Sequence, residues 1–135
     1  ASAPPASQTA VALICVLEKE EGNYIPYMTA SAVDRRHLVT RAIRLLKVSA
    51  DRLIDQGLLH AITQERVYEV VGITYHPKFP AERIAAGQTN EADFEAMFLN
   101  DLALLKVQAD LPSSLTIAED PGLQEFVERM NYEGF

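Results

Sequence analysis

Short apolar or alternating runs separated by polar turns dominate the chain, and they predict strands more often than helices. Residues 10–17, AVALICVL, are apolar throughout and end at a polar turn, which predicts a buried strand. Residues 24–33, YIPYMTASAV, predict the return strand of a hairpin, with Pro26 tolerated near its start. Residues 67–75, VYEVVGITY, are rich in β-branched and aromatic side chains and give the clearest strand.

The second half of the chain adds one more firm strand and one helix. Residues 101–107, DLALLKV, predict a strand, and residues 115–118 and 126–127 are weaker strand candidates. Asn90 has the side chain of a helix cap and precedes a predicted helix over residues 91–99. Outside residues 36–59, the pattern therefore predicts mainly strands with one short helix.

The segment from residue 36 to 59 supports two interpretations. Its apolar residues recur at steps of three and four, which predicts one basic amphipathic helix and an α+β protein. The competing interpretation makes residues 37–41 a strand that runs into one helical turn at 42–46. A loop and a further strand near 53–60 would then follow. Periodicity alone leaves both interpretations open.

Composition places the chain among ordinary globular domains. It has 135 residues, 48% of them hydrophobic and 23% charged, so one domain with its own core is expected. No apolar run reaches the roughly 20 residues that a membrane-spanning helix needs, so we expect no membrane insertion. Residues 1–9 are small and proline-rich, which is typical of a flexible leader or linker.

Charge and the few special side chains narrow the function further. Nineteen acidic against twelve basic residues give a net charge of -7, which opposes binding to nucleic acid. Cys15 is alone, so we interpret it as a small core residue. His37, His60 and His76 lie far apart without metal-ligand spacing. We therefore expect neither a metal site nor a cofactor.

Three phrases follow one another along the chain: AVDRRHLVTRAIR over 32–44, ITYHPKF over 73–79, and NDLALLKV over 100–107. In this order they resemble the N-terminal half of trypsin-like serine proteases. The matching family phrases are a hydrophobic-Val-Thr-Ala-Ala-His-Cys stretch, His-Pro-x-Phe/Tyr, and Asn-Asp-Ile/Leu-Ala-Leu-Leu-Lys. The third phrase is the most specific. The resemblance covers residues 10–127.

This resemblance implies an all-β chain, a six-stranded antiparallel barrel of the trypsin-like serine protease type. It carries short helical turns and a long inserted loop at 80–99. Residues 10–127 would form the barrel, and residues 128–135 a tail or the start of a connection to a missing second barrel. The resemblance also favours the strand interpretation of residues 36–59. An extracytoplasmic location follows from the resemblance only.

The same resemblance implies that the chain lacks the residues needed for proteolysis. In the family the first barrel supplies the histidine and aspartate of the triad, and the second supplies the serine. The histidine position matches Ile43, whereas Asp101 matches the retained acid; Arg44 and Met28 match a cysteine pair. The triad needs an imidazole, because its near-neutral pKa lets it take the hydroxyl proton and return it to the leaving amine. The resemblance thus implies a protease-like domain, inactive in proteolysis, that acts in binding or as a structural part of a larger protein.

One enzymatic alternative stays open. The chain would then be the excised front half of a serine endopeptidase whose remaining catalytic residues lie on the parent chain. The partners expected from these two interpretations are a protein or peptide, or a second barrel of that parent chain.

Two surface features are candidates for binding. The insertion at 80–99 is acidic and is either a partner surface or a solvated loop; we expect its apolar residues to pack on the barrel, with partner anchoring as the alternative. Those residues are Phe94, Met97, Phe98 and Leu99. A basic cluster between residues 35 and 52 includes Arg41 and Arg44, and it is either a docking surface for an acidic segment or scattered surface charge. We expect Arg44 to pair with Asp101.

Overall fold

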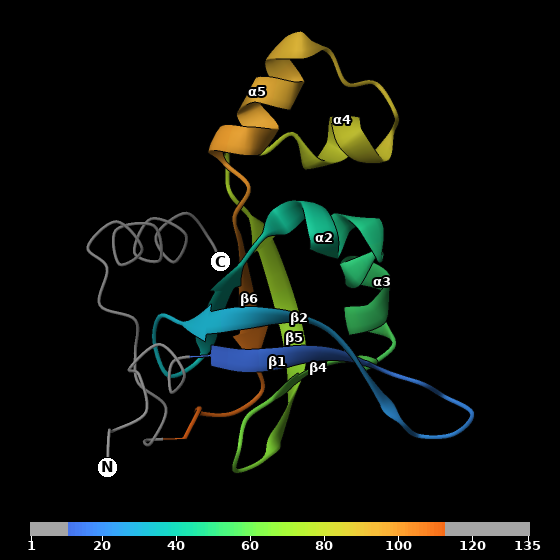
Figure 1. Cartoon of the computed structure of the whole chain (residues 1–135), viewed down its shortest axis with the longest axis vertical. Coiled ribbons are helices and arrows are strands. Elements are labelled where there is room, and N and C mark those ends of the chain that lie inside the picture. Colours follow the sequence, from blue (N-terminus) through green and yellow to red (C-terminus); the bar gives the residue numbers. More distant parts are fainter. Residues whose placement is uncertain (1–10, 113–135) are drawn as a thin grey trace, which may run out of the picture.

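The computed structural model describes residues 11–112, and these form a closed barrel of six antiparallel strands (Figure 1). The predictions for residues 1–9, 115–118, 126–127 and 128–135 lie outside this range. The strands are β1 (Val11–Leu17), β2 (Tyr24–Ala32), β3 (His37–Thr40), β4 (Leu59–Ile62), β5 (Val67–Tyr75) and β6 (Ala103–Val107). Their order around the barrel is β1-β2-β3-β6-β5-β4, with β4 pairing back to β1. The predicted all-β barrel is therefore confirmed.

Alternating positions of the strands fill the barrel interior. The side chains of Ala12 and Ile14 on β1 are buried in the core, as are those of Tyr68 and Val70 on β5. Successive side chains of a strand point to opposite faces, so every second residue of each strand enters the barrel. Cys15 lies between two such positions and is buried as well.

The connection between β3 and β4 contains two short helices, α2 (Ala42–Lys47) and α3 (Ala50–Asp55). A single helix across this segment is thus wrong, and the predicted strand followed by one helical turn is confirmed by β3 and α2. The further strand predicted near 53–60 is displaced, because α3 occupies the start of that range and β4 begins only at Leu59. Ser49 adopts a left-handed conformation, φ 55°, that separates the helices. Gly57, at φ +70°, then turns the chain into β4.

The insertion between β5 and β6 forms a helical unit, α4 (Ala81–Ala85) and α5 (Glu91–Leu99), at one end of the molecule (Figure 1). The predicted helix over 91–99 and its cap are confirmed. The Asn90 side chain accepts the Asp93 N–H at 2.9 Å, and the Asp93 carboxylate accepts the Asn90 N–H at 3.0 Å. Arg83 Nε on α4 donates to Asp93 at 2.7 Å, and this hydrogen bond is the main reason that the pKa of Asp93 is lowered.

The expected packing of the apolar residues of α5 on the barrel is largely wrong. Phe94, Phe98 and Leu99 are 50%, 81% and 73% exposed. Only Met97 of the four is partly buried and packs against the core. The other three apolar side chains of α5 are exposed to solvent instead of packing on the barrel. None of the helices within residues 11–112 is long and apolar enough to cross a membrane.

Candidate functional site

The structure brings together the two positions that the resemblance matched to a catalytic pair. Ile43 lies in the first turn of α2, and Asp101 lies between α5 and β6. The backbone N–H of Ile43 donates to Asp101 Oδ1 at 2.8 Å. The Asp101 side chain is only 11% exposed, so this carboxylate is held in a fixed place beside the start of α2.

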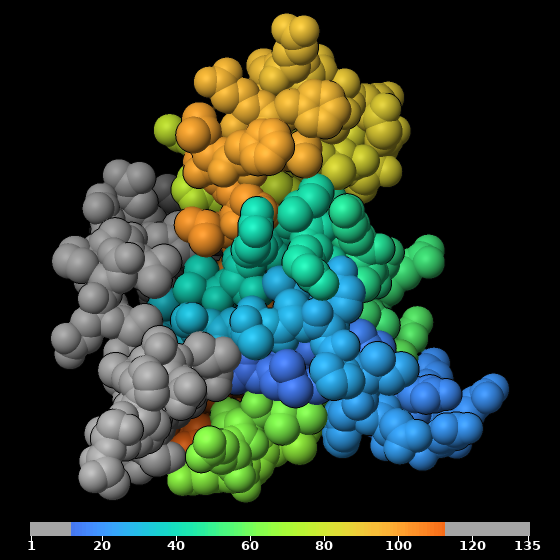
Figure 2. All heavy atoms as spheres, viewed as in Figure 1, coloured from blue at the N-terminus to red at the C-terminus, as the bar shows by residue number. Residues whose placement is uncertain are grey.

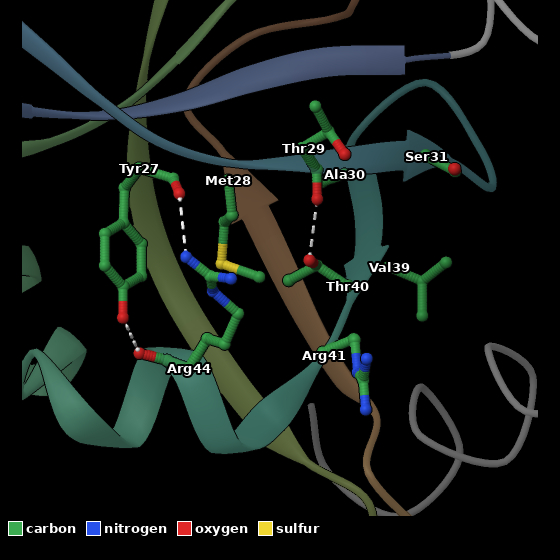
Figure 3. A pocket seen from close by; sticks show the side chains of 9 residues that line it. All are labelled: Tyr27, Met28, Thr29, Ala30, Ser31, Val39, Thr40, Arg41 and Arg44. Carbon is green, nitrogen blue, oxygen red and sulfur yellow. Dashed lines mark hydrogen bonds between the residues drawn. The ribbon is translucent and has the colours of Figure 1, made fainter.

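The second oxygen of Asp101 is bound by Arg41 rather than by Arg44. Arg41 Nε donates to Asp101 Oδ2 at 3.0 Å, while its side chain remains 69% exposed. The expected pairing of Arg44 with Asp101 is therefore wrong. Arg44 turns toward β2, where its guanidinium donates to the Tyr27 carbonyl at 3.3 Å and lies 5.1 Å from the ring centre (Figure 3). The Tyr27 hydroxyl in return donates to the Arg44 carbonyl at 2.6 Å.

The histidine side chains in the described part of the chain make their contacts with residues other than Asp101. His37 Nδ1 contacts the Asp34 carboxylate at 2.9 Å. His60 makes an edge contact with the Tyr24 ring, with centroids 5.3 Å apart, and His76 Nδ1 accepts the Lys78 N–H at 3.1 Å. The Asp101 carboxylate accepts hydrogen bonds from the Ile43 backbone amide and the Arg41 guanidinium. Neither releases a proton near neutral pH, so this arrangement fixes the position of the carboxylate.

A hollow of about 470 Å³ lies between β2, β3 and the start of α2 (Figure 3). It is lined by Tyr27, Met28, Thr29, Ala30, Ser31, Val39, Thr40, Arg41 and Arg44. Thr40 Oγ1 donates to the Thr29 carbonyl at 2.8 Å and so ties β3 to β2 across its floor. The lining includes two arginines and no acidic side chain, which makes the hollow a place for an acidic or apolar group.

The four candidate binding residues fall into two places. Arg41 and Arg44 line the hollow, whereas Phe94 and Met97 lie on α5. Sequence reasoning missed the part of Tyr27, because a single surface tyrosine in a strand carries no signal that an arginine seventeen positions later will stack on it. The match of Met28 and Arg44 to a cysteine pair was the available hint that β2 and α2 face each other.

Neither Cys15 nor the side chains that could bind a metal form a second site in the described residues. Burial raises the pKa of the Cys15 thiol, so the thiol stays protonated and unreactive at neutral pH. Within residues 11–112, histidine, cysteine and carboxylate side chains do not gather in a group of three or more that would hold a metal ion.

Comparisons with known proteins find similarity at the level of structure and not of sequence. No protein-family model matches the sequence, and no curated protein matches it. Among solved structures, human heparin binding protein is similar, with a TM-score of 0.49 and 16% sequence identity. The match covers 87% of this chain and 45% of that protein's chain, so the chain spans less than half the length of this relative.

Proposed function

We propose that this protease-like domain has no proteolytic activity and acts in binding or as a structural part of a larger protein. The observation that carries the proposal is the bonding of Asp101. Its two oxygens accept the Ile43 N–H and Arg41 Nε, and an aliphatic side chain extends from position 43.

Proteolysis by a serine nucleophile depends on proton transfer. A serine nucleophile needs a base that takes its proton and then returns that proton to the leaving amine. Isoleucine has no group that accepts a proton, and the guanidinium of Arg41 stays charged at neutral pH. Removing one triad member lowers turnover by several orders of magnitude. What the domain retains is a shaped surface that includes the hollow beside Arg41 and Arg44.

The partner class follows from the charges. A net charge of -7 opposes contact with a phosphate backbone, so a protein or peptide is the favoured partner. The two arginines of the hollow give this acidic domain a local site for an acidic or apolar group.

One observation favours a second candidate function. Asp101 keeps its hydrogen bond to the backbone of position 43, which is the arrangement that an acid orienting a base at this position would use. The chain would then be the front half of a serine endopeptidase, with its remaining catalytic residues on the parent polypeptide.

Labelling of the parent polypeptide with a fluorophosphonate probe separates the two candidates. The proposal expects no labelled serine and no turnover of fluorogenic peptides. Labelling of the unmodified parent at a rate typical of active serine proteases contradicts the proposal and supports the second candidate.

A pair of variants tests the role of position 43 in the same parent polypeptide. If a serine half is present, Ile43→His should raise the labelling rate by about a hundredfold or more, because it supplies a general base. Adding Asp101→Asn to this variant should remove most of the gain, since the imidazole loses its orienting carboxylate. An Ile43→Gln variant controls for the change in polarity and should show no gain.

A further inference from the structure

Helix α5 presents an apolar surface that nothing in the described part of the chain covers. Phe94 and Phe98 are four residues apart, so they lie on one face of the helix, and Leu99 follows beside them. We call these three side chains the apolar ridge. Large apolar side chains clustered and exposed in this way mark interaction surfaces more often than isolated ones do.

The ridge is held in helical form before any partner binds. The capping box of Asn90 and Asp93 fixes the first turn of α5. Arg83 joins α4 to this turn through Asp93 and also donates to the Gln88 carbonyl at 2.8 Å. A preorganised helix loses little conformational entropy on association, so its exposed phenylalanines are suited to act as anchors in a groove.

The charges of α5 define the kind of groove that would accept the ridge. Glu91 and Glu95 are exposed one turn apart, and α5 contains no basic residue. The third acid, Asp93, is already paired with Arg83. The complementary surface is therefore an apolar hollow with basic side chains at its rim.

The hollow between β2, β3 and α2 has these properties. Tyr27, Met28 and Val39 supply apolar walls, and Arg41 and Arg44 supply positive charge. A guanidinium carries five N–H donors. The side-chain bonds within residues 11–112 use one donor nitrogen of Arg41, toward Asp101, and one of Arg44, toward Tyr27. Donors remain on both side chains for carboxylates of an incoming helix.

The ridge and the hollow lie close together on the molecule. Only Asn100 separates α5 from Asp101, the residue that binds Arg41 at the hollow. Helix α2 lies between α5 and β2 in Figure 1, and all three elements contribute to the face shown in Figure 2. Two complementary patches side by side on one face can be exchanged between two copies by a two-fold rotation, which closes the assembly.

We propose that two copies of this chain form a symmetric dimer in which the apolar ridge of each copy enters the hollow of the other. Phe94 and Phe98 supply the buried anchors, and Glu91 and Glu95 face Arg41 and Arg44 of the second copy. This association does not depend on the absence of proteolysis, so either proposal can fail without the other.

Sedimentation velocity on the whole 135-residue chain tests the dimer. The expected result is a concentration-dependent equilibrium between monomer and dimer. Phe98→Asp should raise the dimer dissociation constant about thirtyfold or more, because it removes a central aromatic anchor. Val71→Asp makes the same kind of change at an exposed valine of β5, outside both patches, and should leave the constant unchanged. Far-UV circular dichroism verifies that both variants are folded.

A charge exchange tests which surfaces meet. Glu95→Arg and Arg44→Glu should each weaken the dimer, and the chain that carries both changes should bind more tightly than either single variant, because the ion pair re-forms with reversed signs. A chain that stays monomeric at every concentration overturns the proposal. So does a dimer that is insensitive to Phe98→Asp, or a double variant weaker than both single ones.

Discussion

At the scale of single residues, the contacts of the Asp101 carboxylate determine the geometry of the site. The Asp101 side chain is nearly buried. One of its oxygens accepts the Ile43 N–H, and the other pairs with Arg41, whose side chain is exposed. Breaking a fully buried ion pair is strongly destabilising, but solvent screens a pair that is exposed on one side. The hydrogen bond from the Ile43 N–H to Asp101 should therefore contribute more to stability than the ion pair with Arg41 does.

Two alanine variants separate these contributions. Asp101→Ala leaves the Ile43 N–H without its acceptor, and we expect a loss of about 1–3 kcal/mol in the free energy of unfolding. Arg41→Ala should cost less than about 1 kcal/mol. Urea denaturation followed by circular dichroism measures both, and Asp101→Asn, which keeps an acceptor for the amide, is the matched control. Equal losses for the two alanine variants would show that the ion pair dominates.

Tyr75 gives a prediction about pH. Its ring stacks on Phe79 at 5.6 Å, and its buried hydroxyl has no hydrogen-bond partner among residues 11–112. Burial, with a smaller effect of the Asp51 charge, raises the pKa of Tyr75 to about 12 from 10.0. The folded chain keeps this proton where the unfolded chain releases it, so stability should fall as pH rises from about 10 toward 12.

The variant Tyr75→Phe should flatten this fall without destabilising the protein at neutral pH, because it removes a buried hydroxyl that lacks a partner. Some pH dependence should remain, since burial also raises the pKa of Tyr68. Urea midpoints measured across the alkaline range test this, with Tyr24→Phe at an exposed position as control. Identical pH profiles for Tyr75→Phe and the unmodified chain would contradict the assignment.

At the scale of elements, the sequence predicted those whose signals are local. β5 coincides with the run of β-branched and aromatic residues over 67–75, and α5 begins directly after its capping residue, Asn90. Helices α2 and α3 were harder to predict from the sequence, because each has only six residues. Their apolar positions together also follow the pattern of one longer helix. The left-handed Ser49 that divides them follows from tertiary packing, as Ala42, Leu45 and Ala50 all enter the core.

The candidate site was predictable to a similar extent. The match of Ile43 and Asp101 to one catalytic pair placed them together, and the structure joins them by a hydrogen bond. Which arginine would reach Asp101 depended on the direction in which α2 leaves β3, and the sequence does not encode this direction locally. The apolar face of α5 was likewise visible as a pattern, but a pattern does not say whether Phe98 meets the barrel or the solvent.

At the scale of the whole molecule, the barrel is closed independently of the helical unit. Strands β5 and β6 pair directly, with Tyr75 opposite Ala103, and the His76 N–H donates to the Leu102 carbonyl at 2.9 Å. The unit formed by α4 and α5 is thus an insertion between two neighbouring strands that already meet. A closed barrel has no open edge that the insertion would need to cover.

This architecture predicts that the helical unit can be removed. In a chain whose residues 81–99 are replaced by a short Gly/Ser linker, the barrel should fold with a free energy of unfolding within about 2 kcal/mol of the original. The lost packing of Ala81, Ile84 and Met97 is partly offset by the lower entropy cost of closing a shorter loop. Urea denaturation measures stability, and sedimentation should show a monomer, because the apolar ridge is gone. A shortened chain that is unfolded would make the insertion part of the core, whereas a folded dimer would place the interface between copies on the barrel itself.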